Sequence, residues 1–497
     1  MQDKDNISEI EIEDQKIVEN IDLNIWEALI PVLALVGMLF YNVYVFGDDA
    51  LGGSNQFILL LGAAVAAIVG TFNKVSYKRM IEEVAENVKS TTGAILILLM
   101  VGALAGTWLI SGVIPTMIYY GLQILNPTIF LASCVIICAI ISIATGSSWT
   151  TSATVGIALI GIAEALGISL GMTAGAVLSG AYFGDKMSPL SDTTNLAPAM
   201  AGTDLFTHIR YMSLTTTPTI IVTLIVFIII GFGLSPEGVA DTAAILTSIN
   251  ASFNINPWLF LVPVLVIVLI IKKTPPLIAL LAGTLLGALA ALIFQPGIVA
   301  NLGGGSTLDF TNGYKGILNA ITIDSAVETD NAALNDLFSA GGMSGMLGTI
   351  WLIICAMVFG GVMDAIGALA RISRALLKLF HTTFGLFAST VISCLALNVT
   401  ASDQYLAIVV PGKMYSKAFK DKGLAPENLS RTLEDSGTVT SVLVPWNTCG
   451  AYQSGVLGVP VLDYFTYAIF NWLSPFMTLI FAAFRIKIKQ LSTVKAS

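Results

Sequence analysis

Two carboxylates lie close together in the sequence, directly after a long part of the chain that is almost free of charged residues. From Thr91 through Gly184 the only charged side chain is Glu164, after which Asp185 and Asp192 stand close together. A charged side chain at the centre of a bilayer costs roughly 2.5–3.5 kcal/mol even on a lenient insertion scale. If this part of the chain lies in a membrane, the two carboxylates need either a watery setting or a role that uses their charge.

Neutral oxygen donors and prolines surround the second carboxylate. Pro189 and Pro198 interrupt helical structure on either side of it, and interrupted backbone at membrane depth is tolerated only beside a cavity or inside protein. The segment therefore predicts a re-entrant hairpin whose tip presents hard oxygen ligands. Such ligands suit small cations such as Na⁺, and the carboxylates can also take up a proton. In the alternative interpretation, Asp185 and Lys186 lie in a cytoplasmic loop and face solvent, and the same alternative applies to Asp192. The cation ligands that we expect here are Asp185, Ser191, Asp192, Thr193, Thr194 and Asn195.

Two further polar clusters interrupt apolar runs, one in each half of the chain. The first contains Thr145, Ser147, Ser148 and Thr150, and the second contains Asn398, Thr400, Ser402 and Asp403. Each cluster predicts a transmembrane helix that is broken at its centre and offers oxygen atoms to an ion. Ser and Thr side chains also commonly form hydrogen bonds between membrane helices, so this alternative stays open for the first cluster. In the second cluster Asp403 adds a charge to the break, which favours a cation site.

A second hairpin is predicted where carboxylates precede another hydroxyl-rich segment. We assign its residues to the substrate pathway, together with the first helix break: Glu434, Asp435, Thr438, Thr440 and Asn447. The two carboxylates of this segment adjoin a basic loop, so an orientation toward the cytoplasm is the alternative.

The composition of the whole chain supports a membrane setting. Hydrophobic residues make up 55% of the 497 residues and charged residues only 11%. Soluble domains carry about 25% charged residues, so this chain cannot cover a water-facing surface of its size. A soluble enzyme, a nucleic-acid-binding protein and a disordered protein are excluded. The sequence predicts an all-α polytopic membrane protein in contact with the lipid bilayer.

Several apolar runs come close to the roughly 20 residues that a membrane span needs. They are Trp26–Phe46, Phe57–Phe72, Thr92–Ile110, Thr128–Ala144, Met212–Phe232, Pro257–Ile271, Pro275–Phe294, Ser344–Val362 and Tyr464–Ala483. Cytoplasmic loops accumulate Lys and Arg, and the segments 73–90, 272–273, 371–378, 413–431 and 485–489 are basic, whereas 47–56 and 234–256 contain neither residue. We therefore expect both termini in the cytoplasm.

This orientation divides the chain into consecutive parts. We expect an acidic disordered cytoplasmic tail (1–25), N-terminal helices with a cytoplasmic loop (26–90), a first repeat (91–233), connecting helices (234–294), an extracellular linker (295–343), a second repeat (344–484) and a basic cytoplasmic tail (485–497). The run that starts at Thr91 leaves the cytoplasm, whereas the run that starts at Ser344 leaves the exterior. The two repeats are therefore predicted to have inverted topology.

A weak internal similarity accompanies these opposed orientations. With an offset of 247 residues (435 minus 188), SPLSDTTNLAPAMAG at 188–202 aligns with DSGTVTSVLVPWNTC at 435–449. Two inverted repeats, each with a re-entrant hairpin and a broken transmembrane helix, are the layout of secondary transporters that bind their substrate near the midplane.

Nucleotide and catalytic motifs are missing from the sequence. There is no P-loop, no HExxH and no dinucleotide-binding GxGxxG, so nothing supports an ATP-driven pump or a membrane protease. We expect no enzymatic activity and no cofactor beyond the transported ions. Gradient-driven transport and passive conduction remain, and titratable carboxylates in both repeats favour alternating access over a pore.

Four segments resemble the NhaC family of bacterial Na⁺/H⁺ antiporters. They are GSSWTTSATVGIAL at 146–159, GAYFGDKMSPLSDTTNLAPAMAGTDLFTHIRYM at 180–212, TASDQYLAIVVPGKMY at 400–415 and LEDSGTVTSVLVPWNTCGAY at 433–452. The resemblance covers about residues 26–483 and implies two inverted repeats in a bacterial inner membrane. The wider group includes malate/lactate exchangers and amino-acid transporters, so a small carboxylate or an amino acid is the alternative cargo. A homodimer is expected by analogy with elevator-type transporters.

Exchange of Na⁺ for H⁺ is the activity that we expect. A cation bound next to a carboxylate lowers the pKa of that carboxylate and expels its proton, so one site can serve both ions in turn. Asp185, Asp192 or Asp403 is expected to carry the proton. The sequence predicts that Asp192→Asn and Asp403→Asn abolish exchange without loss of expression.

Overall fold

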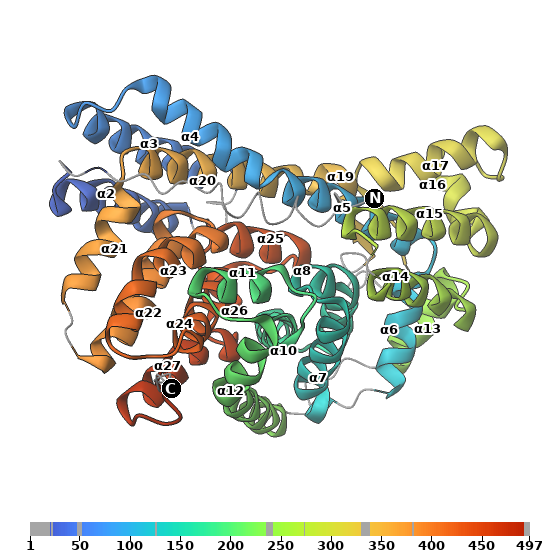
Figure 1. The fold of residues 1–497 in the computed structure, drawn as a ribbon. Helices are drawn as coiled ribbons and strands as arrows, with labels where there is room; N and C mark the ends of the chain where they lie inside the picture. Colours follow the sequence, from blue (N-terminus) through green and yellow to red (C-terminus); the bar gives the residue numbers. More distant parts are fainter. Residues whose placement is uncertain are drawn as a thin grey trace, which may run out of the picture.

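The computed structural model is built almost entirely of helices, as Figure 1 shows. It describes residue 20 and residues 23–46, 52–124, 127–234, 242–272, 274–329, 338–379 and 382–491. Most of the predicted acidic tail 1–25 and the end of the predicted basic tail lie outside these residues. The predicted all-α polytopic fold is confirmed.

The part of the chain before the predicted extracellular linker forms one helix after another. These are α2 (Ile25–Phe46), α3 (Ser54–Phe72), α4 (Tyr77–Ser90), α5 (Thr92–Ile110), α6 (Val113–Ile124), α7 (Pro127–Thr145), α8 (Ser148–Thr151), the π-helix η2 (Ser152–Gly156), α9 (Ile157–Ala165), α10 (Leu170–Met187), α11 (Asp192–Ala201), α12 (Leu205–Gly233), α13 (Thr242–Ser252), the short helix η4 (Pro257–Phe260), α14 (Leu261–Ile271) and α15 (Pro276–Phe294).

The predicted linker is itself folded. It contains α16 (Pro296–Leu302), α17 (Phe310–Thr322) and an antiparallel pair of short strands, β1 (Ser325–Ala326) and β2 (Ser339–Ala340). It packs on α5, where a Cβ built on Gly106 would lie 1.8 Å from the carbonyl oxygen of Ala320.

The last part of the chain is again helical. It consists of α19 (Gly342–Gly345), α20 (Leu347–Ala365), α21 (Ala368–Leu379), α22 (Thr383–Thr400), α23 (Gln404–Asp421), α24 (Glu427–Leu433), the π-helix η5 (Glu434–Thr438), the short helix η6 (Ser441–Leu443), α25 (Thr448–Leu457), α26 (Val461–Phe465) and α27 (Ile469–Ala483).

Within the described residues, eight helices are long and apolar enough to cross a membrane, and a ninth span arises if one bent pair is counted. Two of the predicted spans differ from this. Pro257–Ile271 is one arm of the bent pair, at 86° to Ile245–Ser252, and the helix predicted at Tyr464–Ala483 begins only at Ile469. The helix α22 was not predicted from the sequence, because its polar end merges with the second polar cluster.

The order of elements in the first repeat recurs in the second. Three left-handed backbone positions lie 256 residues (402 minus 146) after their counterparts, since Gly146, Gly167 and Gly202 correspond to Ser402, Gly423 and Gly458. The helix α11 corresponds in the same way to α25, and the helical stretch 148–165 corresponds to α23. The predicted ranges 91–233 and 344–484 contain these elements, and the inverted orientation of the two halves stays a prediction.

Side-chain contacts follow the same offset. Ser142 donates a hydrogen bond to the carbonyl oxygen of Ala181 at 2.6 Å, and Asn398 donates one to that of Gly437 at 2.8 Å. The sequence alignment at an offset of 247 was therefore wrong in register. It matched hydroxyl and proline letters, whereas the structural repeat is defined by helix ends and turns.

Small residues allow α10 to lie against the backbone of α7. A Cβ built on Gly180 would lie 2.2 Å from the carbonyl oxygen of Val135. We predict that Gly180→Ala lowers stability by about 1–3 kcal/mol, because the two helices must separate. Thermal denaturation of the detergent-purified protein measures the effect.

Gly37 is the matched control, because no atom of the described residues lies within 4 Å of a Cβ built there. Gly37→Ala is expected to leave the melting temperature unchanged or to raise it slightly. Equal losses for the two variants would contradict close packing at Gly180.

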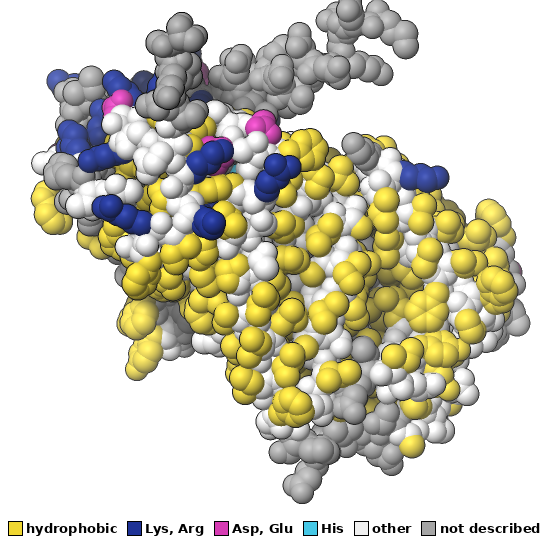
Figure 2. All heavy atoms as spheres, turned by 60° about the horizontal axis from the view of Figure 1, so that its bottom comes forward, with side chains coloured by type: hydrophobic (Ala, Val, Ile, Leu, Met, Phe, Trp, Pro, Cys, Tyr) yellow, Lys and Arg dark blue, Asp and Glu magenta, His cyan; other side chains and the backbone are white. Residues whose placement is uncertain are grey.

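The outer surface carries a broad apolar face. Figure 2 shows hydrophobic side chains over most of one side, with Lys and Arg gathered toward one end. On α12 the exposed large apolar side chains are Phe206, Ile221, Val222, Ile225, Ile228, Ile229 and Phe232. An apolar surface of this extent fits contact with lipid.

Candidate functional site

The first broken helix changes direction over two residues. The helix α7 ends at Thr145, Gly146 adopts a φ of 71°, and Ser147 is extended. The Ser147 hydroxyl accepts a hydrogen bond from the backbone N–H of Thr150 at 3.2 Å, which caps α8. The predicted break is thus present. The first residue of the helix that follows it, Ser148, lies against the side chain of Asp185.

Asp185 lies at the end of α10 with its carboxylate against this helix start. Its Oδ2 accepts hydrogen bonds from the backbone N–H of Ser148 at 3.0 Å and from the Ser148 hydroxyl at 2.6 Å. Its Oδ1 is buried and has no hydrogen-bond partner in the described part of the chain. The residue is 8% exposed, so the alternative of a solvated loop is wrong.

Asp192 begins α11, the second arm of the first hairpin. Its side chain is exposed, and its Oδ2 accepts a hydrogen bond from the Tyr405 hydroxyl at the start of α23. This contact joins the first hairpin to the second broken helix.

The neighbours of Asp192 serve mainly to build the hairpin. Ser191 caps α11 through a bond from the N–H of Thr194 at 3.3 Å, and Thr194 donates to the carbonyl oxygens of Asp185 and Lys186 at 3.2 Å each. Asn195 donates to two carbonyl oxygens of the turn, those of Pro189 and Ser191. These side chains therefore fix the position of the carboxylates.

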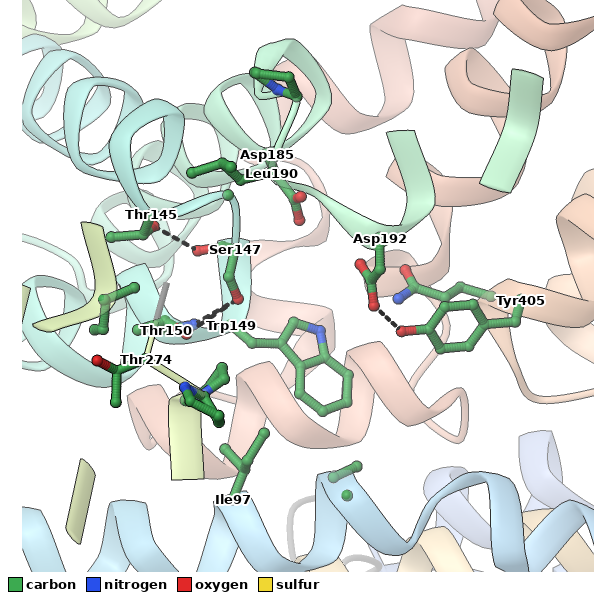
Figure 3. A pocket seen from close by; sticks show the side chains of 18 of the residues that line it. Ile97, Thr145, Ser147, Trp149, Thr150, Asp185, Leu190, Asp192, Thr274 and Tyr405 are labelled. Atoms are coloured by element: carbon green, nitrogen blue, oxygen red, sulfur yellow. Dashed lines mark hydrogen bonds between the residues drawn. The ribbon is translucent and has the colours of Figure 1, made fainter. Parts of the chain in front are cut away.

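A cavity of about 630 Å³ lies between the first hairpin, the two helix breaks and the start of α5 (Figure 3). Asp185 and Asp192 both line it, together with Thr145, Ser147 and Thr150 of the first break. None of the described residues that line the cavity is Lys, Arg or His. The wall is therefore acidic and rich in hydroxyl groups, an environment that favours cations.

The second broken helix has a different arrangement. Asp403 is buried and caps α23, where its Oδ1 accepts hydrogen bonds from the N–H groups of Tyr405 and Leu406 at 2.8 and 3.1 Å. Asn398 donates to Gly437 and to the Thr440 hydroxyl of the second hairpin, and Asn447 donates back to the carbonyl oxygen of Asn398 at 3.0 Å. Thr400 and Ser402 are buried at the same break, and Thr438 is buried on η5.

The structure thus divides the predicted cation ligands into two groups. Asp185 and Asp192 face the cavity, whereas Asp403, Asn398, Thr400 and Ser402 do not line it.

A layer of buried charges lies behind the cavity. Lys186 forms an ion pair with Asp435, and both side chains are completely buried. The Thr215 hydroxyl donates to the other oxygen of Asp435 at 2.9 Å. Asp435 was predicted to lie on the substrate pathway or to face the cytoplasm, and the structure places it in this pair instead, away from the cavity wall.

Glu434 belongs to the same layer. Its Oε1 accepts a hydrogen bond from the Thr193 hydroxyl at 3.2 Å, which links the second hairpin to the first, and its Oε2 is buried without a partner among the described residues. The residue is completely buried, so an orientation toward the cytoplasm is wrong for Glu434 as well.

Comparison with known proteins assigns the chain to a family. The model of the "Na+/H+ antiporter family" matches residues 180–486. The chain belongs to the Na⁺/H⁺ antiporter family. The chain is 37% identical over 423 residues to the Na(+)/H(+) antiporter NhaC of Alkalihalophilus pseudofirmus, with 85% of this chain and 88% of that protein covered. The resemblance to the NhaC family is therefore confirmed.

Two further relatives of this chain have names that include organic cargo. The chain is 37% identical to the Malate-2H(+)/Na(+)-lactate antiporter of Bacillus subtilis, with 90% of this chain and 91% of that protein covered. It is 31% identical to the Arginine/ornithine antiporter ArcD of Halobacterium salinarum, with 91% and 90% covered. Membership of the family and the apolar helices together make this a multi-pass membrane transporter.

Three residues of the cavity and of the layer behind it were not predicted from the sequence. Trp149 and Tyr405 line the cavity, and Lys186 supplies the buried positive charge. Trp149 and Tyr405 occupy equivalent places, since each is the second residue after a capping residue, Ser147 or Asp403. In the sequence, these two residues could have been identified as aromatic residues that closely follow a polar helix break.

The Tyr405 hydroxyl is expected to hold the Asp192 carboxylate at the cavity wall. Tyr405→Phe removes the hydrogen bond to this carboxylate and keeps the aromatic ring. Loss of a hydrogen bond of about 1.4 kcal/mol corresponds to about a tenfold rise in the Na⁺ concentration that gives half-maximal exchange. Exchange in proteoliposomes at a fixed pH, measured over a series of Na⁺ concentrations, tests this prediction.

Tyr452→Phe is the control, because the Tyr452 hydroxyl donates to the carbonyl oxygen of Trp149 at 3.2 Å and bonds to no carboxylate of the described residues. Its half-saturating Na⁺ concentration should match that of the wild type. An unchanged value for Tyr405→Phe would remove the contact between Tyr405 and Asp192 from cation binding.

Proposed function

We propose that this chain exchanges Na⁺ for H⁺ across the membrane and that Asp185 and Asp192 bind either ion at the cavity wall. The observation that carries the proposal is that Asp185 and Asp192 line one cavity with no described Lys, Arg or His in its wall, while the buried Oδ1 of Asp185 has no partner among the described residues. A buried carboxylate oxygen without a partner is costly. Binding of a cation or a proton removes this cost.

Competition between the two ions follows from this geometry. Na⁺ beside the carboxylates stabilises their ionised form and releases the proton, whereas protonation removes the charge that holds Na⁺. Hydroxyl groups of the first break, on Ser147 and Thr150, stand at the same wall and offer further oxygen ligands. No resident metal ion is needed for this mechanism, because Na⁺ is the cargo.

We also propose an orientation in the membrane. The cavity is lined by Ser90 and by Thr274, which adjoin the basic segments 73–90 and 272–273. Basic loops favour the cytoplasmic side, so the cavity opens to the cytoplasm in this conformation. Both termini are then cytoplasmic in a bacterial inner membrane, and a homodimer is the expected assembly by analogy with elevator-type transporters.

Exchange is tested with the purified protein in proteoliposomes that contain a pH-sensitive dye and carry an imposed proton gradient. We expect Na⁺ alone to dissipate the gradient and K⁺ to have a much smaller effect. Silence with Na⁺ alone, followed by proton movement after addition of malate or lactate, would replace the proposal by a carboxylate exchanger. The lack of a lining Lys, Arg or His among the described residues disfavours that outcome.

A further inference from the structure

The cavity is much larger than its proposed cargo requires. Its volume of about 630 Å³ corresponds to roughly 20 water molecules at about 30 Å³ each. Pockets for small organic ligands typically measure about 300–1,000 Å³. The space beside Asp185 and Asp192 therefore holds an organic molecule as readily as a hydrated ion.

The charged residues around this cavity determine whether it favours a positively or a negatively charged ligand. Two carboxylates line the cavity and no basic side chain does so among the described residues. The buried cation behind the wall, Lys186, is occupied by Asp435. A carboxylate ligand would meet uncompensated negative charge, whereas a positively charged ligand would find two counterions.

Aromatic groups complete the wall. Trp149 stacks on Tyr452 with ring centroids 3.9 Å apart and an interplanar angle of 18°, which fixes the orientation of the indole. Figure 3 shows Trp149 projecting toward the space near Asp185, Asp192 and Tyr405. Aromatic faces attract cations, and ammonium ions with methyl groups are recognised in this way.

We infer that the cavity binds an organic monocation of the alkylammonium class in competition with Na⁺. The inference rests on the proposed function in one respect, because it takes Asp185 and Asp192 as the cation site. It goes further in assigning Trp149 to the recognition of the organic part of the ligand. Choline is a suitable probe, and its uncharged carbon analogue, in which a quaternary carbon replaces the nitrogen, is the matched control.

Two measurements on the full-length purified protein test the inference. The first is thermal stabilisation in detergent by choline, by its carbon analogue and by lactate. The second is inhibition of Na⁺-driven proton movement in proteoliposomes by the same compounds. We expect choline to stabilise the protein and to compete with Na⁺, and we expect the carbon analogue and lactate to do neither.

Variants of Trp149 separate recognition of the organic ligand from general damage. In Trp149→Ala the ratio of the choline inhibition constant to the Na⁺ half-saturation constant should rise about tenfold. In Trp149→Phe, which keeps an aromatic face, most of this increase should disappear. An unchanged ratio in Trp149→Ala would remove Trp149 from recognition.

The outcomes distinguish this inference from the proposed function. If Na⁺ drives proton movement and choline neither binds nor competes, the organic-cation inference fails and Na⁺/H⁺ exchange stands. If choline stabilises the protein while Na⁺ moves no protons, Na⁺/H⁺ exchange fails and the cation site stands. Equal effects of choline and its carbon analogue, or competition by lactate, would overturn the inference.

Discussion

Replacing Asp185 by asparagine is expected to abolish Na⁺/H⁺ exchange, by at least about a hundredfold, while the protein stays folded. The asparagine carbonyl oxygen can still accept the hydrogen bonds from Ser148, so the local structure is retained. The second carboxylate oxygen becomes an amide NH₂ group, which cannot bind Na⁺ or exchange a proton. Loss of a charged interaction of about 3 kcal/mol corresponds to about a hundredfold in rate.

Exchange rates in proteoliposomes, normalised to the amount of reconstituted protein, measure the effect of Asp185→Asn. Asp204→Asn is the control, because Asp204 is an exposed carboxylate that caps α12 through the N–H of Thr207 at 2.9 Å. Asparagine caps helices as well as aspartate does, so this variant should exchange normally. An active Asp185→Asn protein would refute the proposed site.

For Asp403→Asn the structure predicts a smaller loss of exchange activity than the sequence did. Its carboxylate caps α23 and does not line the cavity. An asparagine at this position can keep the cap. We therefore expect Asp403→Asn to retain more activity than Asp185→Asn, and the same proteoliposome assay compares the two.

The second large effect concerns stability. Lys186→Met is expected to destabilise the protein by about 3–5 kcal/mol, because it leaves Asp435 buried without its counterion. Both side chains of the pair are completely buried, so water cannot replace the lost partner. Thermal inactivation of the purified protein, followed by size-exclusion chromatography, measures the loss.

A second change isolates the cause of this loss. Asp435→Asn in the Lys186→Met background removes the orphaned charge, and the amide oxygen can still accept the hydrogen bond from Thr215. The double variant should regain most of the lost stability. A double variant as unstable as Lys186→Met would show that packing of the lysine side chain, and not charge, determines the effect.

Much of the fold could be predicted from the sequence, because membrane spans and their interruptions are local properties. About 20 apolar residues specify a span wherever they occur, and α5, α7 and α15 lie close to their predicted ranges. The two helix breaks were found because polar residues interrupt apolar runs. The register of the repeat was not found, since it is defined by left-handed turns such as Gly146 and Ser402 and not by matching letters.

The candidate site could be predicted only in part. Asp185 and Asp192 were identified because carboxylates are rare in apolar sequence. Lys186 stands beside Asp185 and was passed over, since its ion pair spans 249 positions of the chain. Tyr405 was overlooked for the same reason, because its bond to Asp192 spans 213 positions.

The sequence by itself determined the membrane setting, the helical class and the presence of buried carboxylates, because each depends on composition or on a short stretch of residues. The tertiary structure decided which carboxylates share a cavity, which are paired and which cap a helix. Asp185, Asp403 and Asp435 all stand in polar breaks of apolar sequence, yet the first faces the cavity, the second caps α23 and the third pairs with Lys186. The physical reason is that the chemistry of a carboxylate depends on its neighbours in space. These neighbours are adjacent in the sequence for Asp403, but they lie 37 positions away for Asp185 and 249 positions away for Asp435.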